Sequence, residues 1–209
     1  MAISYPLSLP TVTRVRSVDL RAVNAVAYSS SPFTYQGQTH RYQGQMWQAD
    51  ISLPPMRRTA AEQWVAWLLS LEGQYGTFLL GDPTCSVPMG LAKDFAGLPK
   101  VNGANQTGQT LTIDGASKSK TDWLKAGDYI QLGTGTSSRL HKVLQNVTTD
   151  SSGNATIDVW PRIRTAPADN ADVTVSGAKG LFRLSSNEQN WSINEASIYG
   201  ITFGAMEVV

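Results

Sequence analysis

The stretch from Val101 to Ile163 decides the fold of this chain. It contains VNGANQTGQTLTIDG (101–115), LKAGDYIQLG (124–133), RLHKVLQNV (139–147) and DSSGNATIDVWPRI (150–163). Short β-rich runs alternate with Gly, Asp and Asn at the places where a small barrel needs corners. The corners are expected at Gly115, at Gly127 and Asp128, and within residues 133–135 and 150–153. The pattern therefore predicts a small β-barrel, and it carries no motif of reactive chemistry.

The strands of this barrel are expected where β-branched and aromatic residues gather between the corners. They fall near Thr110–Ile113, Asp128–Leu132, Leu140–Val147, Ala155–Trp160 and Val173–Val175. Five short strands separated by turns are typical of OB-like barrels. The preceding residues, 84–100, contain Pro88, Gly90 and Pro99, so we expect an irregular linker there.

Further strand patterns lie outside the barrel. Residues 47–53 alternate apolar and polar side chains, which predicts a half-buried strand. The Tyr-, Gln- and Gly-rich residues 33–48 are interpreted as a hairpin arm with Gly37 and Gln38 at its tip. Other strands are expected at 11–20, where a slip in the alternation indicates a bulge, and at 77–80, 180–184 and 199–208.

One helix is expected directly after Pro54 and Pro55. Thr59 and Glu62 have the spacing of a capping box, in which each side chain binds a free backbone N–H of the first turn. The apolar residues that follow have helical spacing, and Gly73 suits the left-handed end of a helix. We expect this apolar face to be core; it consists of Trp64, Trp67, Leu68 and Leu71.

Strand patterns on both sides of the barrel favour one β domain interrupted by another, because insertions are tolerated where chain ends meet at a surface. The predicted fold is mainly β with one prominent helix. A β-sandwich-like domain is expected from residues 1–83 and 177–209, and an inserted OB-like five-stranded barrel from residues 84–176.

The composition excludes several classes of function. The chain has 17 basic and 16 acidic side chains, so it lacks the basic excess on which sequence-independent nucleic-acid binding depends. Its single cysteine, Cys85, excludes an intrachain disulfide, and we expect a partly buried free thiol. No apolar run reaches the roughly 20 residues of a membrane span, and the first residues lack a signal-peptide pattern. Membrane insertion and export are therefore not expected.

Catalysis is not expected either. The two histidines, His40 and His141, fall in different predicted domains, and His141 is interpreted as a surface position on a strand. No motif of a nucleophile elbow, zinc protease, phosphate loop or dinucleotide site occurs. Most aspartates of the barrel adjoin Gly, Asn, Ser or Thr, as turn aspartates do. The sequence predicts a protein that is not an enzyme and has no cofactor and no metal site.

A binding module is the alternative interpretation. OB-like barrels bind oligonucleotides or oligosaccharides on one face through aromatic and basic side chains. Such a face would consist of Tyr129, Arg139, Lys142, Trp160 and Arg162. The competing interpretation places the two aromatic side chains in the barrel core, because their strand neighbours are apolar.

The order of these parts resembles a known family. The predicted helix is followed by GQYGTFLLGDP (73–83), and the barrel contains AGDYI (126–130). A β domain with a helix, an OB-like insert and a returning strand together resemble the distal tail protein of long-tailed (siphovirus) phages. The first domain is also similar to small minor tail proteins of lambda-like phages. The resemblance covers nearly the whole chain, and its motifs are structural rather than catalytic.

The resemblance implies a structural virion protein of the phage tail tip, or baseplate, made in the cytoplasm of the host bacterium. It implies a homo-oligomeric, hexameric ring that joins the tail tube protein to the tail hub or tip protein. Phage DNA would pass through the ring in transit. The OB-like insert would point outward and support receptor-binding or side-fibre proteins. Host attachment through the barrel is the corresponding role of the alternative binding module.

Ring formation requires an interface between copies, with exposed strands and aromatic anchors. Two segments combine a β pattern with more aromatic surface than a monomer needs. We expect the subunit interface to include Phe33, Tyr35 and Tyr42 of the hairpin arm, and Ile201 and Phe203 of the last strand.

Overall fold

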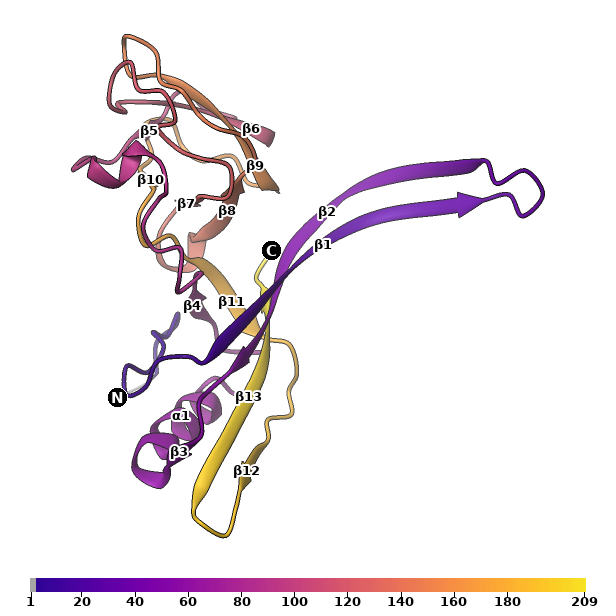
Figure 1. Ribbon diagram of the computed structural model, residues 1–209, viewed down its shortest axis with the longest axis vertical. Coiled ribbons are helices and arrows are strands. Elements are labelled where there is room, and N and C mark those ends of the chain that lie inside the picture. Colours follow the sequence, from indigo (N-terminus) through magenta and orange to yellow (C-terminus); the bar gives the residue numbers. More distant parts are fainter. Residues whose placement is uncertain (1–2) are drawn as a thin grey trace.

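The computed structural model describes residues 3–209 and contains two β-sheets with separate hydrophobic cores (Figure 1). The predicted fold class is confirmed: within the described residues the chain is mainly β, with a single α-helix and a nearly closed barrel. The first sheet takes its strands from residues 17–80 and 180–207, and the barrel takes its strands from residues 100–174.

The first sheet has the strand order β1-β2-β13-β11-β4, and two short strands, β3 and β12, pair with β13. All neighbouring pairs in it are antiparallel. Its strands are β1 (Ser17–Ser30), β2 (Gly37–Ser52), β3 (Met56–Arg57), β4 (Phe78–Leu80), β11 (Gly180–Leu184), β12 (Trp191–Ile193) and β13 (Ile198–Glu207).

The core of this sheet follows from alternation on β2 and β13. Trp47, Ala49 and Ile51 are buried on one face of β2, as the sequence predicts. The helix α1 (Arg58–Ser70) covers that face with its tryptophans. The ring centroid of Trp67 lies 5.1 Å from that of Phe78, so the aromatic face of the helix is core, as predicted.

The expected capping box is wrong. The helix begins two residues earlier, with Arg57 rather than Thr59 as its N-cap, and no side chain caps it. Glu62 instead forms an ion pair with Arg58, with 3.6 Å between Nε and Oε1, and accepts a hydrogen bond from the hydroxyl of Tyr199 at 3.1 Å. Pairing of β3 with β13 holds the residues before the helix in an extended form, so the helix starts where that pairing ends.

The barrel has the strand order β10-β7-β8-β9-β6-β5. A bridge between Lys100 and Asp172 brings its two end strands together, and the side chains of these residues form an ion pair. Its strands are β5 (Lys100–Val101), β6 (Gly108–Asp114), β7 (Tyr129–Leu132), β8 (Arg139–Val143), β9 (Ala155–Ile163) and β10 (Val173–Thr174). The sixth strand, β5, was not predicted, because two residues after a proline give no readable alternation.

Glycines form the barrel corners, as predicted. Gly153 has φ of 90°, and a Cβ there would lie 2.4 Å from the carbonyl oxygen of Ala116. Both the left-handed backbone and the close contact exclude a side chain at this corner. Two short 3₁₀ helices, η1 (Leu91–Asp94) and η2 (Gly135–Ser137), lie in the linker and in the β7–β8 connection.

The hairpin is longer than predicted, and its tip is elsewhere. The chain turns at residues 31–36, where the Ser31 hydroxyl accepts hydrogen bonds from the N–H groups of Phe33 and Thr34. Gly37 and Gln38 therefore belong to β2. The expected strand at 11–20 begins only at Ser17, and a bulge between Asn24 and Val26 lies beyond its expected end.

Candidate functional site

The projecting arm is the most unusual surface feature of the molecule. Strands β1 and β2 contain 14 and 16 residues, and at roughly 3.3 Å per residue a strand of this size spans nearly 50 Å. Their outer parts extend away from both sheets (Figure 1). Because β13 pairs with β2 only over Gln48–Met206 to Ser52–Thr202, the outer arm is a two-stranded ribbon with two free edges.

The outer arm exposes large apolar and aromatic side chains on its surface. Phe33 at the tip is 92% exposed and Tyr35 is 83% exposed. Along the strands, Val26, Tyr28 and Tyr42 are also exposed. The three arm residues of the expected interface, Phe33, Tyr35 and Tyr42, are therefore available for contact with another molecule.

The other two residues of the expected interface are not available. Ile201 is 1% exposed and Phe203 is 6% exposed, because both side chains point from β13 into the core beneath α1. The ring of Phe203 lies 5.6 Å from that of Trp67. Their assignment to a subunit interface is wrong, since these residues stabilise the subunit itself.

The base of the arm is joined to the barrel by an aromatic contact. The rings of Trp47 on β2 and Trp160 on β9 meet edge to face, with centroids 4.5 Å apart. The indole N–H of Trp47 donates to the carbonyl oxygen of Leu140 at 3.0 Å, and that of Trp160 donates to Oδ1 of Asn24 at 2.9 Å. The two sheets thus share a packed junction.

This junction occupies the aromatic face that the alternative interpretation assigned to ligand binding. Tyr129 is buried against Trp47, with 6.1 Å between ring centroids, and the ammonium of Lys142 lies 4.3 Å from the Tyr129 ring centroid. Trp160 packs against the core of the first sheet. Neither aromatic side chain lies in the barrel's own core, and neither presents a free stacking platform.

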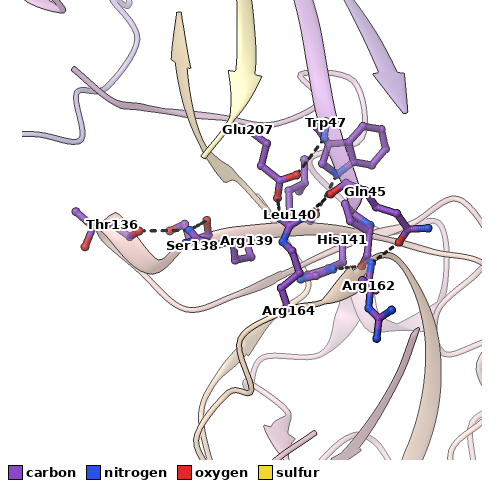
Figure 2. A network of polar contacts seen from close by, with 11 residues as sticks. Gln45, Trp47, Thr136, Ser138, Arg139, Leu140, His141, Arg162, Arg164 and Glu207 are labelled. Atoms are coloured by element: carbon purple, nitrogen blue, oxygen red, sulfur yellow. Dashed lines mark hydrogen bonds and ion pairs between the residues drawn. The ribbon is translucent and has the colours of Figure 1, made fainter. Parts of the chain in front are cut away.

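A polar network completes the junction, as Figure 2 shows. Glu207 is buried, accepts a hydrogen bond from the backbone N–H of Trp47 at 3.0 Å, and forms an ion pair with Arg164 at 2.8 Å. The side-chain Oε1 of Gln45 accepts a hydrogen bond from the backbone N–H of Arg162 at 2.8 Å. The backbone carbonyl oxygen of Gln45 accepts one from the Arg164 guanidinium. Burial raises the pKa of Glu207, although both contacts of its carboxylate oppose the shift.

The remaining basic residues of the predicted binding face have different surroundings. Arg139 is half-buried, and its Nη1 donates to the carbonyl oxygens of Ser138 at 3.0 Å and Thr136 at 3.3 Å. Arg162 contributes its backbone to the junction. The five residues of the predicted face therefore do not form one continuous surface.

His141 is not a surface residue, so that prediction is wrong. It is 3% exposed, and its Nδ1 lies 2.7 Å from the carbonyl oxygen of Pro161. Burial lowers the pKa of His141 to about 4, and the charges of Arg164 and Arg139 act in the same direction. The strand was misread because both Leu140 and His141 are buried, one toward the first sheet and one toward the barrel interior.

The cysteine and the turn aspartates are two further features that the sequence predicts. Cys85 is a free, partly buried thiol, as predicted. Asp150 accepts hydrogen bonds from the N–H groups of Ser152 and Asn154, as a turn aspartate does.

Among residues 3–209, no group of three His, Cys, Asp or Glu side chains is arranged to hold a metal ion. Over the same residues, no helix has the length and apolar character needed to cross a bilayer.

Comparison with known proteins gives no assignment: no family model matches the chain, and no curated protein sequence matches it.

Proposed function

We propose that this chain is a structural protein of a phage tail tip, a distal tail protein whose copies form a ring. The proposal rests on the projecting arm, together with the resemblance in the order of domains. The ring would be hexameric, would join the tail tube protein to the hub or tip protein, and would surround the channel for DNA. The site of action would be the virion, and no catalytic step is expected.

The arm supports assembly because its outer part is a two-stranded ribbon without a hydrophobic core of its own. A two-stranded ribbon is marginally stable in water unless another surface covers it. Its outer part carries exposed Val26, Tyr28 and Tyr42, and its tip carries Phe33 and Tyr35. Aromatic side chains of this kind are the usual anchors of protein interfaces. The free strand edges also offer backbone groups for pairing with a neighbouring chain.

A ring requires that the arm of each copy contact a different surface on the next copy, without a reciprocal exchange of arms. The arm projects from the body far enough to reach a neighbouring copy (Figure 1). Such a heterologous contact closes into a ring when its rotation divides a full turn. Arm-to-arm pairing would give a dimer instead, and the experiment below distinguishes the two.

The alternative, a binding module that uses the aromatic face of the barrel, has no support in this geometry. Tyr129 is buried, and Trp160 is packed against Trp47 of the arm-bearing strand. A glycan or oligonucleotide would have to separate the two sheets to stack on these rings.

The test is the oligomeric state of the purified protein at high concentration, measured by light scattering and negative-stain microscopy. The double variant Phe33→Ser and Tyr35→Ser should abolish the ring and leave the unfolding temperature unchanged, because both side chains make few contacts within the subunit. Tyr75→Ser is the matched control, since Tyr75 is 74% exposed on the body of the protein.

Three outcomes would contradict the proposal. One is a strictly monomeric chain that is also missing from assembled particles. Another is a closed two-fold dimer. The third is a ring that persists in the double variant, which would move the interface away from the arm.

A further inference from the structure

A cavity of about 260 Å³ opens at the mouth of the barrel, beside the connection from β9 to β10. The rings of Tyr129 and Trp160 and the residues of the arm do not line it, although Arg139 and Arg162 of the predicted binding face do. Polar side chains on its wall are those of Ser137, Arg139, His141, Arg162, Arg164 and Thr165. Its apolar wall consists of Leu132, Ile163, Ala166, Pro167, Ala168 and Ala171. Barrel mouths with a mostly apolar wall and a few converging polar groups are common ligand sites.

His141 supplies an unused hydrogen-bond acceptor to this cavity. Its Nδ1 lies 2.7 Å from a carbonyl oxygen, which can only accept, so Nδ1 carries the proton. Nε2 is then the bare nitrogen, and it has no protein partner among the hydrogen bonds of residues 3–209. It is not one of the fully enclosed, unpartnered polar atoms of these residues, so it stays open to the cavity. The side chain is 3% exposed and lines the cavity. An acceptor that is open to a cavity in this way can take a hydrogen bond from water or from a ligand that donates one.

Arg139 supplies unused donors. Only its Nη1 has protein partners, the two carbonyl oxygens near η2. Its Nε and Nη2 groups have none within the described part of the chain, and together they match the two oxygens of a carboxylate. Half-burial lowers the pKa of Arg139, and the residue stays charged at neutral pH.

The charge balance at the mouth favours an anion. Glu207 is the acidic residue in contact with the arginines of the barrel mouth. Both of its carboxylate oxygens are already occupied, one by Arg164 and the other by the backbone N–H of Trp47. Arg164 is thereby neutralised. The charges of Arg139 and Arg162 have no carboxylate partner within the ion pairs of the described residues.

We propose that the mouth of the barrel binds one acidic sugar residue, such as a uronic acid. Its carboxylate pairs with Arg139, and one hydroxyl donates to Nε2 of His141. The carbon-bound hydrogens of the sugar ring pack on the wall formed by Pro167 and Ala171. The cavity is slightly smaller than the roughly 300 Å³ at which sites for drug-sized ligands begin, so it suits a single sugar ring. This site goes beyond the proposed function, because ring assembly does not require it.

The experiment is calorimetric and NMR titration of the full chain with glucuronate, with glucose and with inorganic phosphate. Glucuronate should bind at least tenfold more tightly than either of the other two, because only it supplies both the carboxylate and the hydroxyl donors. It should shift the Nε2 resonance of His141 while the Nδ1–H tautomer persists.

Arg139→Gln should weaken glucuronate binding by about tenfold or more. Ala166→Trp, which fills the cavity and keeps every charge, should abolish it. The matched control is Arg183→Gln, a half-buried arginine of β11 in the other sheet, which should bind like the unmodified chain. Because Ala166 is half-buried at the cavity wall, this second variant still tests the site if Arg139→Gln fails to fold.

Equal binding of glucuronate and phosphate would show a general anion site and overturn the proposal. Absence of binding in a folded protein would overturn it too, as would binding that survives in Ala166→Trp. Loss of glucuronate binding with an intact ring would leave the proposed assembly role untouched, so the two proposals can fail independently.

Discussion

The indole N–H of Trp47 reaches across from the first sheet and donates a hydrogen bond to the carbonyl oxygen of Leu140 in the barrel, at 3.0 Å. Trp47 stands on the strand that continues into the arm, and Leu140 on the barrel strand that also carries Arg139 and His141. The arm and the barrel therefore leave the body from one shared junction, and their relative orientation depends on it.

Replacing Trp47 tests the strength of this junction. Trp47→Phe should lower the free energy of unfolding by about 2 kcal/mol, because the Leu140 carbonyl loses its donor and part of the ring contact is lost. Urea unfolding would measure the change. Trp191→Phe on the edge strand β12, where the side chain is exposed, should change stability by less than about 0.5 kcal/mol. Equal effects of the two variants would show that the junction contributes nothing specific.

The buried ion pair should be costly to break from one side. Arg164→Gln should destabilise the protein by about 3–5 kcal/mol, because Glu207 would be left as an uncompensated charge in the core. Adding Glu207→Gln to that variant should restore part of the loss, because the buried charge is then removed. A double-mutant cycle in urea measures this coupling. Additive effects of the two substitutions would argue that the pair is solvated.

The histidine at the barrel mouth should make stability depend on pH. The pKa of His141 falls from an ordinary value of 6.5 to about 4 in the folded chain. Between these two values the unfolded chain binds a proton that the folded chain does not, so stability decreases as pH is lowered. The total loss from this residue should be about 3 kcal/mol, at 1.36 kcal/mol for each pKa unit.

His141→Gln provides the comparison that isolates this effect. The raised pKa of Glu207 acts in the opposite sense, because an acid that is harder to ionise in the folded state gains stability on acidification. Glu207 is present in both proteins, so the difference between their pH profiles reports His141. Parallel profiles from pH 7 down to pH 4 would contradict the assigned burial and tautomer.

Removing the barrel should leave a folded first domain. The flanking segments already meet, since β4 pairs with β11 from Leu80 opposite Gly180. A chain that joins Pro83 to Gly177 through a short Gly/Ser linker should retain cooperative unfolding. It should be less stable than the full chain, because Tyr129 and Leu140 no longer cover Trp47. Loss of all cooperativity in calorimetry would show that the two sheets form one folding unit.

Alternation allowed the half-buried elements to be predicted from the sequence. The β2 segment around Ala49 and Ile51 has one buried and one solvated face, as do most barrel strands. Apolar and polar residues therefore alternate along these strands, and the alternation shows where each strand lies. The arm could not be delimited in this way, because both of its faces are exposed and its pattern has no period. The two-residue strand β5 is too short for any period to show.

The site residues show a second limit of sequence reasoning. Ile201 and Phe203 are apolar residues on a strand, and the same composition suits an interior or an interface. Tyr129 and Trp160 pack against Trp47, which is remote from them in the chain. The burial of His141 depends equally on distant residues. Phe33, Tyr35 and Tyr42 could be proposed as contact residues because the arm combines a β pattern with more aromatic surface than a monomer needs. All three are exposed, and their role in an interface stays a prediction.

The bulge between Asn24 and Val26 sets the direction in which the arm leaves the body. A bulge bends and twists the strand that carries it, and this one lies between the anchored base, where Asn24 binds Trp160, and the free ribbon beyond Val26. In an assembly built through the arm, the angle set there fixes the turn from one copy to the next. In such an assembly, removing the bulge would change that angle, and with it the number of copies that close the circle.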